Sequence, residues 1–534
     1  MQGMSGSRTV RAALIGLAAL WGATEAEAAS LLVNTDKGPV QGTAVNGIRE
    51  FLGIPYAAPP VGDLRWQPPT PHASWTTPLS ATQFANHCPQ PATPFGLASV
   101  TEDCLFLNVF TPNDGGFFGI FRRPVMVWIH GGALVTGESD DYDPTKLVNE
   151  GVVVVTINYR LGALGFLAHP ALAAEATDPD RNNDTDAGST GNYGLMDQQL
   201  ALLWVQRNIA AFGGDPRNVT IFGESAGGLS VLSQLASPAS SGLFHKAIVE
   251  SGAYALNTLT LATAEAAGAA FAAAAGCSSQ TTACLRALPV ATILAHEQTT
   301  GYTPNIDGDF LPLSLGTAFA TGQFNHVPVI QGTNHDEWRL FTALDFDLIG
   351  HPIPNTEAGY EAALATLVGP VAAPTVAAQY PLASFPSADI AFAAAGTDAV
   401  FACPALSADI SLAKFVPVFA YEFNDENAPE LFLPPVSFPY GAAHASELQY
   451  LFDVRASFSV PLSTAQQELA DTMRDYWTNF AKFGEPSFFG TPFWLPFNAF
   501  FDDMQSLVPP SPTGENNFAI AHHCAFWGVT LPTK

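Results

Sequence analysis

The chain has 534 residues, of which 48% are hydrophobic and 11% aromatic, so it can bury a large core as one elaborated unit or several domains. Its 48 acidic residues outnumber its 20 basic ones, which gives a formal net charge of -28. This balance argues against nucleic-acid binding and against attraction to anionic membranes, and it weakly disfavours anionic substrates.

The first 28 residues have the pattern of a secretory signal peptide. Two arginines precede the apolar run 12–23 (AALIGLAALWGA), and small residues at Ala26 and Ala28 form a cleavage site. An N-terminal core helix is the alternative interpretation. We expect cleavage after Ala28, export of residues 29–534 to the periplasm or the medium, and no membrane span in the mature chain.

Export makes the six cysteines candidates for disulfide bonds. Short sequence separation favours two local pairs and leaves the last two cysteines for each other across a long loop: Cys88–Cys104, Cys277–Cys284 and Cys403–Cys524. We expect no metal site, because no C-x-x-C or H-E-x-x-H spacing occurs and the adjacent His522 and His523 are isolated in the sequence.

Short apolar runs of strand length alternate with helical stretches along the chain. The runs are 125–129, 152–157, 219–222, 247–249, 327–331 and 416–421. The helical stretches are 195–212, the residues after 225, 262–275 and the amphipathic segment 464–483. Such alternation predicts a mainly parallel α/β sheet covered on both faces. The polar stretch 176–190 reads as an exposed loop insertion, and without repeats or linkers we expect one catalytic domain.

The segment FGESAGG, residues 222–228, contains a serine between glycines. G-x-S-x-G alone is a weak signal, since the chain has 45 glycines and chance matches are common. Here the motif follows a predicted strand and precedes a helical stretch, which is the arrangement of a nucleophile elbow. Ser225 would then expose its hydroxyl at a helix N-terminus; a small residue in a tight turn is the alternative.

A serine nucleophile needs a base, an orienting carboxylate and donors for the oxyanion. The segment IHGGA, residues 129–133, closes a predicted strand and matches the oxyanion loop of esterases and lipases. Glycines there would let backbone N–H groups approach the reacting oxygen. A simple strand-ending turn is the alternative.

Longer segments of the chain resemble the type-B carboxylesterases, the carboxylesterase and cholinesterase group of the α/β-hydrolase fold. The segments are FLGIPYAAPPVGDLRW (51–66), EDCLFLNVFTP (102–112), NYRLGALGFL (158–167) and the stretch 191–228 that ends in FGESAGG. The resemblance extends from about residue 34 to 527. It implies a large, mainly parallel sheet with helices on both faces, serine esterase activity, and no metal or organic cofactor.

The resemblance assigns the partners of Ser225. The family acid is the glutamate of G-x-N-x-D-E, matched here by GTNHDE, so Glu337 carries over and Asp336 is its neighbour. Trp338 stands where the family usually has glycine. The family histidine lies in a pattern like G-x-x-H-x-x-E-L, matched by GAAHASEL, which assigns His444 as the base. The order serine, glutamate, histidine agrees with the fold.

The resemblance also implies an oxyanion hole made by the N–H groups of Gly132, Ala133 and Ala226. Alanine at 133 replaces a glycine found in many members, so we expect a narrower pocket. Family positions near the histidine are matched by Glu224, Ser251 and Glu447. Structural hydrogen bonding would explain these three side chains equally well. The family's disulfides match the three pairs favoured by spacing.

The expected partner is a small-molecule ester, and the sequence does not define its identity or the oligomeric state. The stretch 89–103 lacks the tryptophan that cholinesterases use to hold choline, so a choline ester is not expected. Aromatic side chains that could line the pocket or belong to the core are Phe95, Phe106, Trp338 and Phe341. Alternative functions are a lipase for insoluble long-chain esters and a non-catalytic binding protein of the same fold.

Overall fold

The computed structural model describes residues 30–113, 122–176, 190–297, 302–458, 460–488 and 490–532. The predicted signal peptide and most of the predicted loop insertion 176–190 lie outside the described residues.

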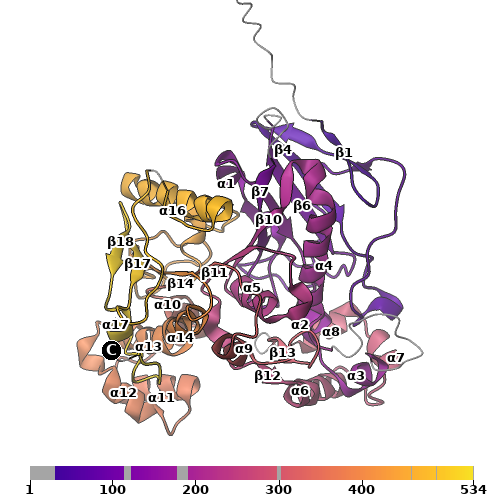
Figure 1. Cartoon of the computed structure of the whole chain (residues 1–534). Coiled ribbons are helices and arrows are strands. Elements are labelled where there is room, and N and C mark those ends of the chain that lie inside the picture. The colour runs from indigo at the N-terminus through magenta and orange to yellow at the C-terminus, as the bar shows by residue number, and fades with distance from the viewer. Residues whose placement is uncertain are drawn as a thin grey trace, which may run out of the picture.

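A single large sheet organises the molecule (Figure 1). Its strands are β3 (Thr43–Val45), β4 (Ile48–Pro55), β6 (Phe106–Pro112), β7 (Arg123–Ile129), β9 (Val153–Ile157), β10 (Gly214–Glu224), β11 (Lys246–Glu250), β14 (Val329–Asn334), β15 (Val418–Phe423), β17 (Met504–Leu507) and β18 (Thr513–Glu515). The 11 strands lie in the order β18-β17-β15-β14-β11-β10-β7-β9-β6-β4-β3. Pairing is parallel from β9 to β17 and antiparallel at both edges. All six runs predicted as strands lie in the parallel part, which confirms the predicted fold class.

Smaller sheets and helices surround this sheet. The remaining strands are β1 (Leu32–Asn34), β2 (Pro39–Gln41), β5 (Leu79–Ser80), β8 (Tyr142–Asp143), β12 (Leu259–Thr260), β13 (Asn305–Ile306) and β16 (Asp453–Val454). The helices are α1 (Thr145–Asn149), α2 (Gly162–Phe166), α3 (Pro170–Ala176), α4 (Tyr193–Asn208), α5 (Ala226–Ala236), α6 (Leu261–Ala274), α7 (Thr282–Arg286), α8 (Val290–His296), α9 (Leu315–Thr321), α10 (Trp338–Thr342), α11 (Glu357–Val368), α12 (Ala373–Gln379), α13 (Ala388–Gly396), α14 (Cys403–Leu412), α15 (Leu448–Leu451), α16 (Thr464–Phe483) and α17 (Phe518–Ala521). The predicted helix 464–483 is therefore confirmed with its bounds, which a capping box between Ser463 and Gln466 and a left-handed Gly484 define.

Alternate residues of the central strands face two cores on opposite sides of the sheet. Val125 and Val127 of β7 pack in the core that contains α4 and α5, whereas Met126 and Trp128 pack in the core that contains α16. Figure 1 shows α4 and α16 on opposite sides of β10. Because both faces are buried, these strands contain runs of consecutive apolar residues, such as 125–129, and do not alternate apolar with polar ones.

One continuous helical stretch, 388–412, has the length and apolar composition of a membrane span. Its most apolar window is 72% buried inside the molecule, which is typical of the core helix of a globular protein. Helices α11 and α12 reach the same composition only together, across a bend of 114°.

The three predicted disulfide bonds are present. Cys88–Cys104 closes a loop before β6, and Cys277–Cys284 joins the end of α6 to α7. Cys403–Cys524 joins the start of α14 to the residues that follow α17, across 121 residues. The C-terminal segment is thereby covalently attached to the helical layer beside β14 and β15.

Candidate active site

Ser225 lies in a sharp turn between β10 and α5. Its backbone has φ 55° and ψ -120°, a conformation that costs energy for a residue with a side chain, and its N–H donates to the Glu250 carbonyl at 2.8 Å. A Cβ atom on Gly223 would lie 2.5 Å from the Ile129 carbonyl oxygen, and one on Gly227 only 1.9 Å from it. The turn therefore requires glycine on both sides of the serine, as a nucleophile elbow does.

His444 lies on the loop between β15 and α15, and Glu337 follows β14 directly. Nδ1 of His444 is 2.5 Å from Oε2 of Glu337, and both side chains are buried. The other oxygen of Glu337 accepts hydrogen bonds from the Thr333 hydroxyl at 2.7 Å and the Asn334 N–H at 2.8 Å. With both carboxylate oxygens occupied, Glu337 fixes the orientation of the imidazole.

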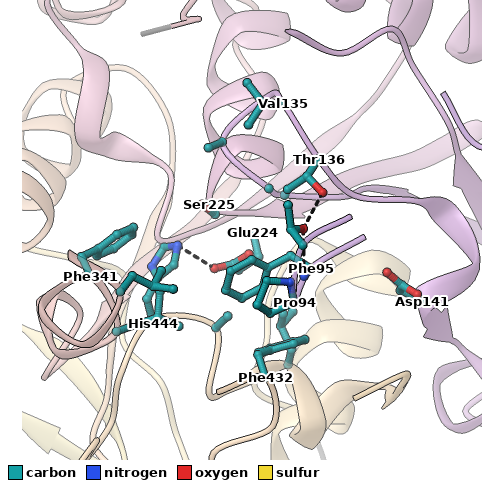
Figure 2. Close-up of a pocket in the computed structure, with 18 of the residues that line it drawn as sticks. Pro94, Phe95, Val135, Thr136, Asp141, Glu224, Ser225, Phe341, Phe432 and His444 are labelled. Carbon is teal, nitrogen blue, oxygen red and sulfur yellow. Dashed lines mark hydrogen bonds and ion pairs between the residues drawn. The ribbon is translucent and has the colours of Figure 1, made fainter. Parts of the chain in front are cut away.

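The other ring nitrogen of His444 faces Glu224, the residue before the serine. Nε2 lies 3.2 Å from Oε1 of Glu224, an ion pair drawn as a dashed line in Figure 2. Within the described part of the chain, Nε2 forms no hydrogen bond to the Ser225 hydroxyl. Catalytic hydrogen bonds are often long in unliganded sites and shorten when substrate binds.

The carboxylates around His444 raise its affinity for a proton. Burial lowers the pKa of His444, but the charges of Glu224, Glu337 and Glu447 and the hydrogen bond that His444 donates to Glu337 outweigh burial and raise the pKa to about 9. Burial raises the pKa of Glu224 to about 8, in spite of the opposing effect of His444. The carboxylates therefore stabilise a proton on His444, and this proton has to leave before His444 can act as a base.

Two further predicted residues are Glu447 and Ser251. Glu447 accepts a hydrogen bond of 2.5 Å from the Asn334 side chain, which also donates to the Ala443 carbonyl at 2.8 Å. Burial raises the pKa of Glu447 to about 7. Ser251 is buried, and its hydroxyl forms no hydrogen bond with any described residue. Glu447 thus supports the histidine loop, while Ser251 makes no recorded contact with His444.

The predicted oxyanion loop lies against the serine. A Cβ atom on Gly131 would be 3.2 Å from Cβ of Ser225, and the next residues, Gly132 and Ala133, have φ of 97° and 54°. Ala226 is the first residue of α5. The backbone N–H groups of Gly132, Ala133 and Ala226 donate to no acceptor in the described residues. All three amides are therefore free to bind an oxygen atom.

These groups open into one cavity of about 400 Å³. Figure 2 shows Ser225 and His444 at its wall with rings from several distant segments. The phenylalanine and leucine side chains that line it are Phe95, Phe341, Phe432, Leu294, Leu340, Leu344 and Leu448. Of the four aromatic residues that the sequence left open between pocket and core, Phe95 and Phe341 line the cavity and Phe106 and Trp338 do not. Phe106 starts β6, and Trp338 packs behind Phe341 with ring centroids 4.7 Å apart.

Asp336, the neighbour of the predicted acid, has a different place. Its carboxylate accepts the Ala442 N–H at 3.0 Å and pairs with Arg339 at 2.8 Å. Its own N–H donates to the Ala442 carbonyl at 3.0 Å. Asp336 therefore links the loop of Glu337 to the loop of His444 without touching the imidazole.

Sequence reasoning missed three acidic side chains of the cavity wall, Asp141, Glu297 and Asp345. None belongs to a motif or to a helical or strand periodicity. Asp141, eight residues after Ala133, and Asp345, eight residues after Glu337, each follow a segment that the sequence marked as functional, whereas Glu297 does not.

One group of potential metal ligands occurs among the described residues: His87, Glu138 and Asp140. The His87 ring lies 3.4 Å from Glu138 and 2.9 Å from Asp140. The guanidinium of Arg455 lies 2.8 Å from the other oxygen of Asp140. Because these cations already pair with the two acids, an ion-pair network explains the group and we assign no metal to it.

Comparison with known proteins places residues 29–527 in one family. The model of the carboxylesterase family matches residues 29–527. The para-nitrobenzyl esterase of Bacillus subtilis (strain 168) is 36% identical over 480 residues, which cover 85% of this chain and 90% of that protein. An acylcarnitine hydrolase of Mus musculus is 35% identical over 94% of this chain and 91% of its own. A solved PNB esterase structure superposes with a TM-score of 0.77 at 33% identity, covering 94% of this chain and 99% of that one.

Proposed function

Because the chain belongs to the carboxylesterase family and is a serine carboxylic ester hydrolase, we propose that Ser225 is its nucleophile and that hydrolysis proceeds through an acyl-enzyme. One observation carries this assignment. The serine in the strained turn, the imidazole oriented by Glu337, and three free amides open into the same cavity. This combination supplies nucleophile, base and oxyanion donors at one place.

In the proposed mechanism, neutral His444 accepts the proton of Ser225 at Nε2 while Oγ attacks the ester carbonyl. The carbonyl oxygen, now negative, binds the N–H groups of Gly132, Ala133 and Ala226, each of which is worth about 3 kcal/mol in such sites. His444 then gives its proton to the departing alcohol oxygen. A water molecule repeats the sequence, attacks the acyl-enzyme and releases the acid.

Glu337 keeps Nδ1–H directed at its carboxylate throughout and stabilises the imidazolium. Glu224 binds Nε2 in the resting site. Attack on the ester therefore requires Nε2 to exchange Glu224 for the serine hydroxyl. This exchange involves two neighbouring residues of one turn, so only a small rotation of the imidazole is needed.

Replacement of Ser225 with alanine tests the assignment. We expect Ser225→Ala to lose covalent labelling by an organophosphate and nearly all hydrolysis of p-nitrophenyl butyrate, with an unchanged melting temperature. Ser241→Ala, which removes an exposed hydroxyl, is the matched control and keeps both properties. If Ser225→Ala kept its labelling or its turnover, another residue would have to be the nucleophile.

The cavity favours small, uncharged and apolar esters. Its volume of about 400 Å³ and its phenylalanine and leucine lining suit acyl or alcohol groups of short to medium size. Relatives named for para-nitrobenzyl esters, acylcarnitine and cocaine are consistent with a broad ester range. A series of p-nitrophenyl esters of increasing chain length tests this. We expect the highest kcat/KM for esters with short to medium acyl chains. A rate that rises only above the solubility limit of the ester would indicate a lipase.

We also propose that the protein is exported. The N-terminal pattern of residues 1–28 and three disulfide bonds both fit an oxidising compartment. The full-length chain should appear in the periplasm or medium with residue 29 as its N-terminus. A chain that begins at residue 29 should stay in the cytoplasm. If the full-length chain and this shortened chain were found in the same compartments in the same proportions, export would be contradicted.

A further inference from the structure

The wall of the catalytic cavity contains more acidic groups than the proposed chemistry uses. Apart from His444, the charged side chains that line it in the described part of the chain are Asp141, Glu224, Glu297 and Asp345. Glu224 belongs to the histidine cluster, and Asp345 is exposed to solvent. No lysine or arginine lines the described wall. Asp141 and Glu297 therefore act as fixed acidic groups within an otherwise apolar cavity.

Asp141 lies across the cavity from the catalytic base. In Figure 2, His444 and Phe341 lie on one side of Ser225 and Asp141 lies on the other. Asp141 directly precedes Tyr142, which also lines the cavity and pairs through β8 with β16. The short strand pairing holds Asp141 at this end of the cavity.

The surroundings of Asp141 do not neutralise it. Its Oδ1 lies 3.0 Å from Nε of Arg455, but the same guanidinium lies 2.8 Å from Asp140 and 3.5 Å from Glu138. His87 pairs with the latter two acids. Three carboxylates thus share one arginine and one histidine, so that when all three are ionised a net negative charge remains beside the cavity even with His87 protonated.

Glu297 is held at a different wall, beside the oxyanion loop. A Cβ atom on Gly162 would lie 1.5 Å from its Oε1, so the carboxylate occupies space that only glycine leaves open. The Ala163 N–H donates to this carboxylate. The Gly162 N–H donates to the Leu134 carbonyl at 2.6 Å, and Leu134 follows Ala133 in the chain. Backbone contacts therefore fix Glu297 close to the proposed oxyanion hole.

We propose that Asp141 and Glu297 make the cavity select against anionic esters, so that the enzyme hydrolyses uncharged and cationic esters and rejects those with a free carboxylate. This proposal rests on the proposed function of the same cavity. An anionic substrate would lose its hydration without gaining a cationic partner, and it would approach fixed charges where water and salt screen poorly. Because Asp141 and Glu297 lie at different walls, they would repel a carboxylate on either the acyl or the alcohol part of the ester.

The proposal has a pH signature. Burial raises the pKa of Asp141 to about 7; Glu138 and Asp140 add to this effect, and Arg455 and His87 oppose it. Burial raises the pKa of Glu297 to about 8, although the hydrogen bond from the Ala163 N–H acts to lower it. Both groups are neutral well below these values and charged well above them, so rejection of anionic esters should increase from about pH 6 to about pH 9.

Two matched substrate pairs test the proposal on the mature enzyme. One pair is the mono-p-nitrophenyl ester of adipic acid and its adipamide counterpart, which places the carboxylate on the acyl side. The other is the butyrate ester of p-hydroxybenzoic acid and that of p-hydroxybenzamide, which places it on the alcohol side. Each kcat/KM is divided by the rate of alkaline hydrolysis to remove intrinsic reactivity. Within a pair, titration of His444 affects both substrates and cancels in the ratio.

We expect the wild type to prefer the amide member of each pair by about tenfold or more at pH 9, and by less at pH 6. The double variant Asp141→Asn/Glu297→Gln should bring both ratios close to one at every pH. The control Glu361→Gln, which removes an exposed acid on α11, should leave the ratios at wild-type values. Wild-type ratios near one, or ratios unchanged in the double variant, would overturn the proposal. Absence of turnover for all four esters would instead contradict the proposed function.

Discussion

Two buried histidines of this protein have similar partners and different surroundings. His444 lies between Glu337 at 2.5 Å and Glu224 at 3.2 Å. His522, just after α17, lies between Asp398 and Glu422, each at 2.5 Å. In both, burial lowers the pKa but the two carboxylates outweigh burial, and the pKa rises above its ordinary value of 6.5.

The difference lies in what else each imidazole reaches. His444 lines the cavity, and its Nε2 is held by an ion pair longer than a good hydrogen bond, next to Ser225. His522 has both nitrogens in short hydrogen bonds and packs against Phe518 at 4.5 Å, away from any described cavity. A charged pair of acids around a histidine is therefore not a catalytic signature. A loosely held nitrogen that faces a cavity and a nucleophile is the distinguishing feature.

The largest expected contrast comes from replacing each histidine with glutamine. His444→Gln removes the base, and we expect the kcat of the folded enzyme to fall on the order of 10⁶-fold. A steady-state assay with p-nitrophenyl butyrate measures this loss, and thermal unfolding measures the folded fraction. Turnover above about one thousandth of wild type would show that His444 is not the base.

His522→Gln should lower stability without lowering kcat. It leaves Asp398 and Glu422 buried without their cation, so we expect a loss of about 3–5 kcal/mol in the free energy of unfolding. The folded fraction should keep the wild-type kcat, because His522 does not reach the cavity. Urea unfolding and active-site titration check these two statements. A large loss of kcat per titrated site would mean that the two clusters are coupled.

A smaller effect separates the carboxylates around His444. Among the charges of its acidic neighbours, the charge of Glu224 raises the pKa of His444 most and the charge of Glu447 least. Because only neutral His444 accepts the serine proton, kcat/KM rises with pH through this pKa. In Glu224→Gln the rising limb should move to lower pH by on the order of one unit. Glu447→Gln is the control and should move it less. If the rising limb of kcat/KM did not move in Glu224→Gln, the charge of Glu224 would not be a cause of the raised pKa of His444.

The smallest effect is the pH dependence of the His522 contribution to stability. The folded pKa of His522 lies above 6.5, so its contribution is complete below that value and is lost as the pH rises through the folded pKa. Burial raises the pKa of Glu422, but the effect of His522 is larger and lowers this pKa to about 2. The contribution of Glu422 to stability is therefore complete above its ordinary pKa of 4.5 and is lost as the pH falls through the folded pKa. The stability difference between wild type and His522→Gln should therefore peak between about pH 4.5 and pH 6.5. A difference that is constant from pH 4 to pH 9 would contradict this assignment.

The same contrast explains what the sequence could predict. Strands of the parallel sheet were predictable, because burial on both faces requires apolar runs at residues such as 125–129 and 219–222. The turn at Ser225 was predictable, because its sterically required glycines flank the serine directly. Glu337 and His444 are 107 residues apart, and only the family resemblance indicated that the fold brings them together.

Residues whose role depends on tertiary contact alone were not predictable. His522 appeared isolated in the sequence, yet its two partners come from positions 124 and 100 residues earlier. Trp338 and Phe341 are three residues apart, and helix α10 directs only Phe341 to the cavity. Glu297 owes its place to the missing side chain of Gly162, a relation between two distant segments that no local pattern records.

The Cys403–Cys524 bond makes a closed covalent ring out of the C-terminal part of the chain. This ring contains His444 and the whole of α16, whereas Ser225 and Glu337 lie outside it. A single peptide-bond cleavage anywhere within the ring would open it without releasing a fragment. The segment that supplies the base would stay tethered to the segments that supply the nucleophile and the acid. This topology means that one proteolytic cut is not equivalent to loss of the catalytic base.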